Sequence, residues 1–232
     1  MSDICKALNL DMECLRQSCI TIEEREHMDA TFMLLSLVHL FLKEKDDTKD
    51  TGGHVVLVLF QNNFQHLNNI AMKLFMNLKS LIQNKKLTLL EVYKEETSVK
   101  EKFLFVHNAI SDINAQEKIV VFSNLNNLSY MGASSRDVFN FAQYIRNTNS
   151  EDVCILHCTH NKKDTAIHTL NNAFKHMSSY VLEVSNLRTG FCKEISGHIN
   201  VSNKYKDYKK NHHFQYTNRG VNVFLPGALS TR

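Results

Sequence analysis

The chain contains little proline, little glycine and no long apolar run. Of its 232 residues one is proline and seven are glycine, so Pro-rich linkers and collagen-like or mucin-like segments are excluded. The longest apolar stretch, 32–42, is interrupted by Ser36 and His39 and is far shorter than the ~20 residues that a bilayer requires. We therefore expect a buried helix at 32–42 and no contact with a membrane.

The N-terminus lacks a secretion signal, and the cysteines lack a disulfide framework. Residues 1–4, MSDI, show neither the basic stretch nor the apolar core of a signal peptide. The six cysteines are scattered and would stay free thiols in a reducing compartment. We expect a cytoplasmic protein, with the nucleus as the alternative. The formal net charge of +3 does not by itself require a nucleic-acid partner.

Short β-like runs alternate with helical periods over the first three quarters of the chain. The pattern predicts strands at 19–23, 54–60, 87–93, 119–123 and 153–158, and helices at 30–43, 64–82, 103–113, 134–146 and 165–177. Ser134 or Ser135 and Asp164 are the expected N-caps of the last two helices. Strands that alternate with helices imply crossover connections and a mainly parallel sheet with helices on its faces.

After residue 179 the helical period disappears. Strands are predicted at 180–184, 199–202, 213–217 and 221–225, with a tight hairpin at 218–220 that uses Gly220. The fold class is therefore α/β, a helix-flanked parallel sheet with an antiparallel C-terminal extension. We expect a single domain over 1–232, whose least regular part is roughly the first eighteen residues.

A phosphate-binding loop is missing where an α/β chain of this order would carry one. Such a loop needs glycines between the first strand and its helix, because backbone N–H groups must converge on the anion. The segment 23–31 has no glycine and holds four carboxylates: Glu23, Glu24, Glu26 and Asp29. Gly52 and Gly53 precede a strand and so lie at the wrong end.

The acid that would bind magnesium is missing as well. The strand 119–123 ends in Ser123 and Asn124, and neither side chain brings a negative charge. The dinucleotide fingerprint GxGxxG is also absent. We therefore assign no catalytic residue and no cofactor, and we expect a protein that is not an enzyme.

The densest group of cysteines and histidines lies at 154–160. On a strand, Cys154 and Cys158 share one face whereas His157 points to the other, so buried thiols are favoured over a zinc site. A nucleophile formed by Cys158 or Cys192 with a distant histidine stays open, although no local motif supports it. We assign no metal ligand.

The most basic stretch runs from 204 to 219. Five cations, Lys204, Lys206, Lys209, Lys210 and Arg219, face one acid, Asp207, which gives a local charge of +4. Tyrosines and histidines lie between them, as on surfaces that follow an RNA backbone. A solvated loop is the other interpretation. A smaller basic pair, Lys162 and Lys163, follows the strand at 153–158.

Two segments carry a family resemblance. Residues 58–66, VLFQNNFQH, and residues 187–199, LRTGFCKEISGHI, resemble the Gln-x-x-Phe-x-His and Thr-Gly-Phe-Cys segments of the Elongator complex protein six family. A weaker likeness covers roughly 55–227, whereas the first fifty residues match poorly. Relatives often carry Tyr and Gly where this chain has Leu67 and Phe75.

The resemblance implies a RecA-like fold with degenerate nucleotide motifs. It further implies a heterohexameric ring with Elongator proteins four and five, within a complex that modifies the wobble uridine of tRNAs. The subunit would support assembly and tRNA binding, together with the remaining Elongator subunits, while other chains perform the chemistry. The alternatives are an active RecA-type ATPase or recombination-related protein, and a RecA-like scaffold of another complex.

The resemblance also suggests where RNA would bind. In RecA-like rings the loops after the central strands face the pore, which corresponds here to 130–137 and 159–164. Arg136, Lys162 and Lys163 lie in these loops, and Lys204, Lys206, Lys209 and Lys210 form the competing surface. We favour the loops, because a pore combines the contributions of several subunits on one RNA.

Overall fold

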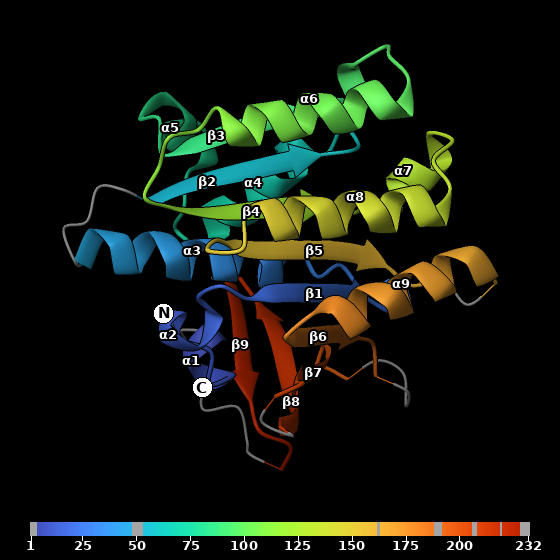
Figure 1. Cartoon of the computed structure of the whole chain (residues 1–232). Coiled ribbons are helices and arrows are strands. Elements are labelled where there is room, and N and C mark those ends of the chain that lie inside the picture. Colours follow the sequence, from blue (N-terminus) through green and yellow to red (C-terminus); the bar gives the residue numbers. More distant parts are fainter. Residues whose placement is uncertain are drawn as a thin grey trace.

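The computed structural model describes residues 4–47, 53–161, 163–187, 192–205, 208–218 and 220–227. Within these residues, nine strands form one mixed sheet in the order β3-β2-β4-β5-β1-β6-β7-β8-β9 (Figure 1). The first six strands in this order, β3, β2, β4, β5, β1 and β6, are parallel to one another, whereas β6, β7, β8 and β9 pair antiparallel. The strands are β1 (Cys19–Glu24), β2 (Gly53–Leu59), β3 (Leu87–Glu91), β4 (Glu117–Ser123), β5 (Val153–Thr159), β6 (Tyr180–Ser185), β7 (Gly197–Asn203), β8 (Tyr208–Thr217) and β9 (Gly220–Phe224).

Helices cover both faces of this sheet. The helices are α1 (Ile4–Ala7), α2 (Met12–Leu15), α3 (Thr31–Asp47), α4 (Phe64–Lys73), α5 (Leu78–Gln83), the 3₁₀ turn η1 (Val92–Lys94), α6 (Val99–Ser111), α7 (Asn127–Tyr130), α8 (Ser135–Thr148) and α9 (Thr165–Met177). One apolar core joins α1 to α5 with one face of the sheet, and a second joins α6 to α9 with the other. The predicted fold class is confirmed.

Helix α3 is buried on nearly every side, which explains its continuous apolar sequence. The ring of Phe32 packs 5.1 Å from that of Phe214 and 5.7 Å from that of Tyr216, both in β8. The antiparallel strands therefore curve over α3, which also packs on α1, α4 and β2. In the described part of the chain no helix combines the length and hydropathy needed to span a bilayer.

Side-chain caps set several helix starts. Asp164 accepts hydrogen bonds from the N–H groups of Ala166 (3.0 Å) and Ile167 (3.1 Å), and α9 spans the predicted residues. Ser134 caps α8, as expected. Helix α6 begins four residues earlier than the periodicity predicts, because Ser98 and Glu101 form a reciprocal capping box.

The helix predicted at 64–82 is wrong as a single helix, because it is interrupted between α4 and α5. Phe75 adopts a left-handed φ of 58°. Its N–H bonds to Met72 O, and Met76 N–H bonds to Ala71 O, the two bonds of a Schellman C-cap. Asn77 then caps α5 by accepting from Ser80 N–H. The apolar period continues across the break because both helices pack against the same core.

Candidate functional site

The candidate site is the edge where the parallel strands end. Strand β5 lies between β1 and β4, so these three strands deliver Glu23 and Glu24, Ser123 and Asn124, and Thr159 to one edge. In open α/β sheets ligands bind beyond the carboxyl ends of the strands. A nucleotide bound at this edge would therefore meet the loop from β1 to α3 first.

Carboxylates of the chain occupy the start of α3. Glu24 Oε1 accepts a hydrogen bond from Ala30 N–H (2.9 Å), and Asp29 Oδ1 accepts one from Thr31 N–H (2.8 Å). Burial raises the pKa of Asp29, but the bonds from Thr31 and the neighbouring His66 outweigh burial, and the net pKa is lowered. The N–H groups that would hold a phosphate are thus already bound to anions.

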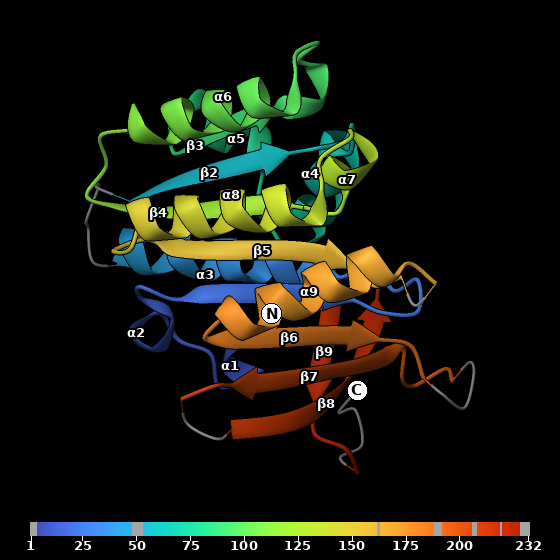
Figure 2. The ribbon, with the colours of Figure 1, turned by 45° about the vertical axis from the view of Figure 1, so that its right-hand side comes forward.

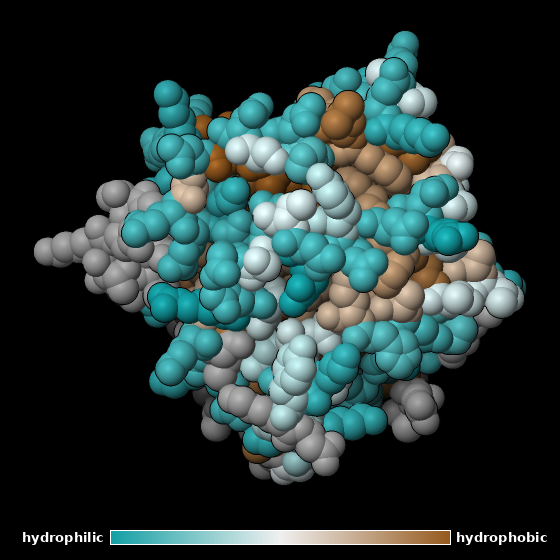
Figure 3. All heavy atoms as spheres, in the orientation of Figure 1, coloured by the Kyte–Doolittle hydropathy of each residue, from teal (hydrophilic) through white to brown (hydrophobic). Residues whose placement is uncertain are grey.

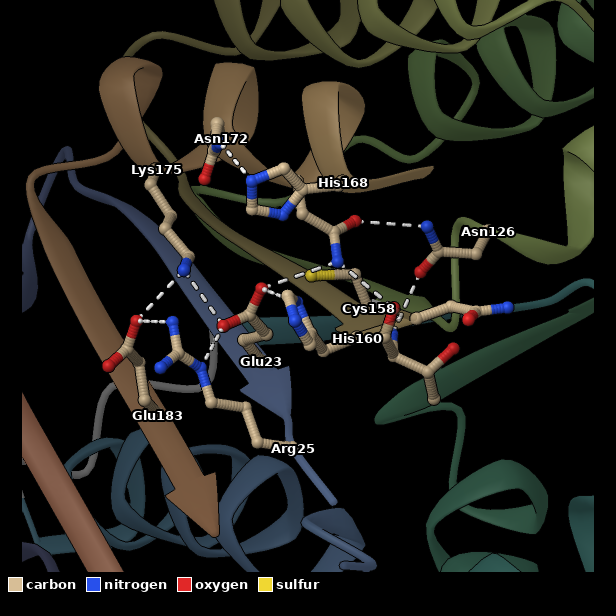
Figure 4. Close-up of polar contacts among 12 residues, drawn as sticks. Glu23, Arg25, Asn126, Cys158, His160, His168, Asn172, Lys175 and Glu183 are labelled. Atoms are coloured by element: carbon tan, nitrogen blue, oxygen red, sulfur yellow. Dashed lines mark hydrogen bonds and ion pairs between the residues drawn. The ribbon is translucent and has the colours of Figure 1, made fainter. Parts of the chain in front are cut away.

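An ion cluster around the buried carboxylate of Glu23 lies beside this loop (Figure 4). The Glu23 side chain is fully buried, and its Oε2 accepts from Arg25 Nε (2.6 Å) and Lys175 Nζ (2.8 Å). The same two cations donate to Glu183 Oε1, at 2.6 and 2.8 Å. Burial raises the pKa of Glu23, but the bonds from Lys175 and Arg25 prevail and lower it. The negative charges of Glu23 and Glu183 are therefore neutralised by the positive charges of Arg25 and Lys175.

Neutral amides connect the ends of β4 and β5 to α9. Asn126 Oδ1 accepts from Thr159 N–H (2.8 Å), and Asn126 Nδ2 donates to Asn171 Oδ1 (3.0 Å). Asn171 Nδ2 donates in turn to the Thr159 carbonyl (2.9 Å). Both asparagines are completely buried. Neutral amides, which cannot neutralise a metal ion, thus connect the ends of β4 and β5 to α9.

His157 is held on the α3 side of the sheet. Its Nδ1 accepts from Asn124 N–H (3.2 Å), which places the ring proton on Nε2. Nε2 lies 2.9 Å from Glu24 Oε1, without the alignment of a hydrogen bond. The residue is buried and joins the β4, β5 and β1 ends into one rigid edge.

Cys154 and Cys158 pack in the opposite core, below α8 and α9. A hydrogen bond with Cys19 and burial raise the pKa of Cys154, and burial raises that of Cys158. Both groups are therefore protonated thiols and poor nucleophiles. Across the described residues, no three His, Cys, Asp or Glu side chains converge as metal ligands would.

The predicted RNA-contacting residues divide between two edges of the sheet. Arg136 and Lys163 are exposed at the starts of α8 and α9, which are joined by a bond from Ser135 Oγ to Ala166 O (3.3 Å). Lys204, Lys209 and Lys210 lie in the hairpin of β7 and β8, at the opposite edge (Figure 2). Lys162, Lys206 and Arg219 lie outside the described residues.

The segment at 58–66 contacts the loops of this edge. His66 Nε2 lies 2.7 Å from Asp29 Oδ2, and Asn127 Nδ2 donates to Gln61 Oε1 (2.8 Å). The motif therefore joins the loops after β1, β2 and β4. Of the second motif, residues 188–191 lie outside the described residues.

Sequence reasoning missed the ion cluster of Glu23, Arg25, Lys175 and Glu183. It interpreted Glu23 only as a charge that repels phosphate. One signal was available, because Glu23 is an acid inside a strand whose other residues up to Ile22 are apolar or small. Arg25 is only two residues from Glu23, but Lys175 and Glu183 could not be identified as members of the cluster, since Glu183 lies 158 residues from Arg25.

Comparisons with known proteins agree with this geometry. The sequence model of the family described as Elongation complex protein 6 matches residues 2–219. The chain is 22% identical to Elongator complex protein 6 of Mus musculus over 217 residues, covering 80% of this chain and 79% of the relative. It is 24% identical to that of Xenopus laevis over 204 residues, covering 75% and 74%.

A solved structure shows the same fold. A KaiC-like protein of the archaeon Pyrococcus horikoshii superposes with a TM-score of 0.63 and 11% identity, over 90% of both chains. At this identity the likeness concerns the fold alone, and it agrees with a RecA-like sheet. The family model matches from residue 2, so the match includes the first fifty residues, where only a poor likeness was expected, and the chain belongs to the Elongation complex protein 6 family.

Proposed function

We propose that this chain is a non-catalytic subunit of Elongator that forms a RecA-like hetero-oligomeric ring with Elongator proteins four and five. The ring would support wobble-uridine modification by binding tRNA, while other subunits carry out the chemistry. Family membership supports the placement in Elongator. The filled phosphate position at the start of α3 supports the absence of catalysis.

The bonds of Glu24 and Asp29 are the observation that carries the proposal. A triphosphate at the start of α3 would have to displace two hydrogen bonds to charged groups, each of about 1.5–3 kcal/mol. It would also approach Glu26 and two carboxylates already in place. No residue of this loop offers compensating positive charge except Arg25, which is already bonded to Glu23 and Glu183.

An exposed apolar surface supports a role in an assembly. Leu104 of α6 and Tyr144 of α8 are 57% and 51% exposed, and they line a groove of about 530 Å³. Figure 3 shows apolar side chains gathered between these two helices. A contiguous exposed apolar surface of this kind is typical of a site that contacts another protein.

For RNA, the proposal assigns the contact to the loops that carry Arg136 and Lys163. The bond between the starts of α8 and α9 holds both loops at one edge, where charges can add. Substituting both residues by Gln in the assembled ring should weaken tRNA binding and reduce its salt dependence. As a matched control, Lys209 and Lys210 lose the same charge at the opposite edge. Loss of binding in the control alone would transfer the RNA site to the hairpin.

Assembly is tested in cells. The tagged chain should co-purify with Elongator proteins four and five, and the intact mass should correspond to a heterohexamer. The purified chain should show no magnesium-dependent ATP hydrolysis. A stable monomer with no affinity for either protein would refute the ring. An ATPase rate that is lost when Glu24 and Asp29 are substituted would refute the non-catalytic assignment.

A further inference from the structure

We propose that the chain has a nucleotide-binding pocket at the edge opposite the candidate site, where the parallel strands begin. This arginine pocket is a cavity of about 630 Å³ lined by Arg16, Ser18, Arg146, Ser179, Asn203 and Tyr205 among others. The two guanidinium groups would hold a phosphate, and the ring of Tyr205 would stack on the base. The volume lies within the range of small-molecule sites, about 300–1,000 Å³.

Four segments, distant in sequence, are bonded together around this pocket. The Ser18 carbonyl accepts from Cys154 N–H (3.0 Å), which fixes the loop between α2 and β1 beside β5. Ser179 N–H donates to the Cys19 carbonyl (2.8 Å), and the Ser179 carbonyl accepts from Lys204 N–H (3.0 Å). The wall is therefore built on strand ends and does not depend on a free loop.

The charge of the pocket suits an anion. Arg16 and Arg146 face one lining acid, Glu13. The Nε of Arg146 is buried and, among the described residues, has no hydrogen-bond partner, an arrangement that a bound anion would correct. Arg16 Nη2 lies 3.9 Å from Glu117 Oε1, and the Arg16 side chain is 54% exposed. Two guanidinium groups can grip one phosphate through parallel N–H bonds, which single lysines cannot.

Tyr205 provides the second half of the recognition. Its side chain is 75% exposed, and its backbone N–H donates to Asn203 Oδ1 (2.8 Å), which holds the turn at the pocket rim. An exposed aromatic ring beside a phosphate site is the arrangement with which proteins stack nucleobases. Lys204 follows β7 in the same turn, and its Nζ donates to the His176 carbonyl (3.0 Å).

The inference does not depend on the ring or on Arg136 and Lys163, which lie at the other edge. The shared chemistry is a phosphate next to a planar base, supplied by a free nucleotide or by an RNA strand. Two probes separate these sources: uridine monophosphate, and a fluorescein-labelled decamer of single-stranded uridine RNA. Binding of both indicates a mononucleotide site, and binding of the decamer alone indicates an RNA-strand site.

The test compares variants of the full chain by calorimetry for the monophosphate and by fluorescence anisotropy for the decamer. Arg16→Gln together with Arg146→Gln should weaken binding at least tenfold and lower the decamer's salt slope by about 0.7–1.4, since a single strand contributes about 0.7 per neutralised phosphate. Because Arg146 is partly buried, Arg16→Gln and Tyr205→Ser serve as exposed single substitutions, each expected to weaken binding several-fold. Circular dichroism checks that each variant is folded.

The control pair Lys79→Gln and Lys100→Gln removes the same charge from exposed positions in α5 and α6 that do not line the pocket, and it should leave affinity for the monophosphate unchanged. Wild-type affinity in folded Arg16→Gln and Tyr205→Ser chains, or no binding of either probe, would overturn the pocket. Neither result bears on whether the chain co-purifies with its ring partners. Conversely, a chain that does not co-purify with ring partners can still be tested for binding in the arginine pocket.

Discussion

The ion cluster around the buried Glu23 carboxylate predicts a measurable change in the free energy of unfolding when its charge is removed. Replacing Glu23 by Gln keeps the shape of the side chain but removes its charge. The carboxylate is fully buried and accepts charge-assisted bonds from Arg25 (2.6 Å) and Lys175 (2.8 Å). The substitution leaves two cations facing a neutral amide in a region with little access to water.

The expected loss is about 3 kcal/mol. Each bond to a charged group contributes about 1.5–3 kcal/mol. Both cations keep their bonds to Glu183, and the Arg25 side chain is 36% exposed, so solvent recovers part of the loss. For a domain of this size, 3 kcal/mol lowers Tm by about 6–12 °C.

Urea denaturation followed by circular dichroism measures the change, and thermal melts check it. Glu183→Gln is the matched control, because Glu183 accepts from the same two cations but its side chain is 21% exposed. The control should cost about 1 kcal/mol, since water can replace the lost bonds. The reasoning is refuted if Glu23→Gln stays within about 0.5 kcal/mol of wild type, or if the control proves the more damaging.

Two further predictions concern acid and the helix break. The folded-state pKa values of Glu23 and Asp29 are both lowered, so their stabilisation is complete above the unfolded values, near pH 4, and is lost as pH falls through the folded values. Urea midpoints measured against pH should therefore drop in acid, with a shallower drop in Glu23→Gln. Phe75→Gly should raise the free energy of unfolding by about 1 kcal/mol, because the left-handed φ of 58° suits glycine and the Phe75 side chain is 74% exposed. As a control, Phe105→Gly within α6 should lower the free energy of unfolding, since glycine is unfavourable inside a helix. A loss of stability in Phe75→Gly would contradict the strain assigned to Phe75.

Local chemistry was predictable from the sequence wherever neighbouring residues decide it. The N-cap Asp164 and the helix after it follow from capping preference and apolar periodicity. The lack of glycine in the segment 23–31 likewise indicates that this segment does not form a phosphate-binding loop. The break at Phe75 was not predictable, because Phe gives no sign of a left-handed turn and the apolar period continues into α5.

The candidate site depends more on contacts distant in sequence. Asn126 and Asn171 meet only because β4, β5 and α9 converge on one edge. Likewise, charge favoured the surface at 204–210 and the pore argument favoured the loops, but neither could show that the two surfaces lie at opposite edges, which depends on the direction in which β7 runs against β6. These contacts require a particular order of strands in the sheet, and that order cannot be deduced from any single segment of the sequence.

The position of β1 in the sheet has a consequence for how the chain is made. Cys19 of β1 pairs with Cys154 of β5, and Ile20 pairs with Tyr180 of β6. A ribosome adding 5–20 residues per second needs roughly 7–27 s to pass from Cys19 to Cys154, the first of these partners to be synthesised. Throughout that interval β1 has neither neighbour, and Phe32 of α3 still lacks Phe214, which packs on it in the finished fold. The first strand synthesised is therefore enclosed only near the end of translation, and its apolar neighbourhood needs protection until then.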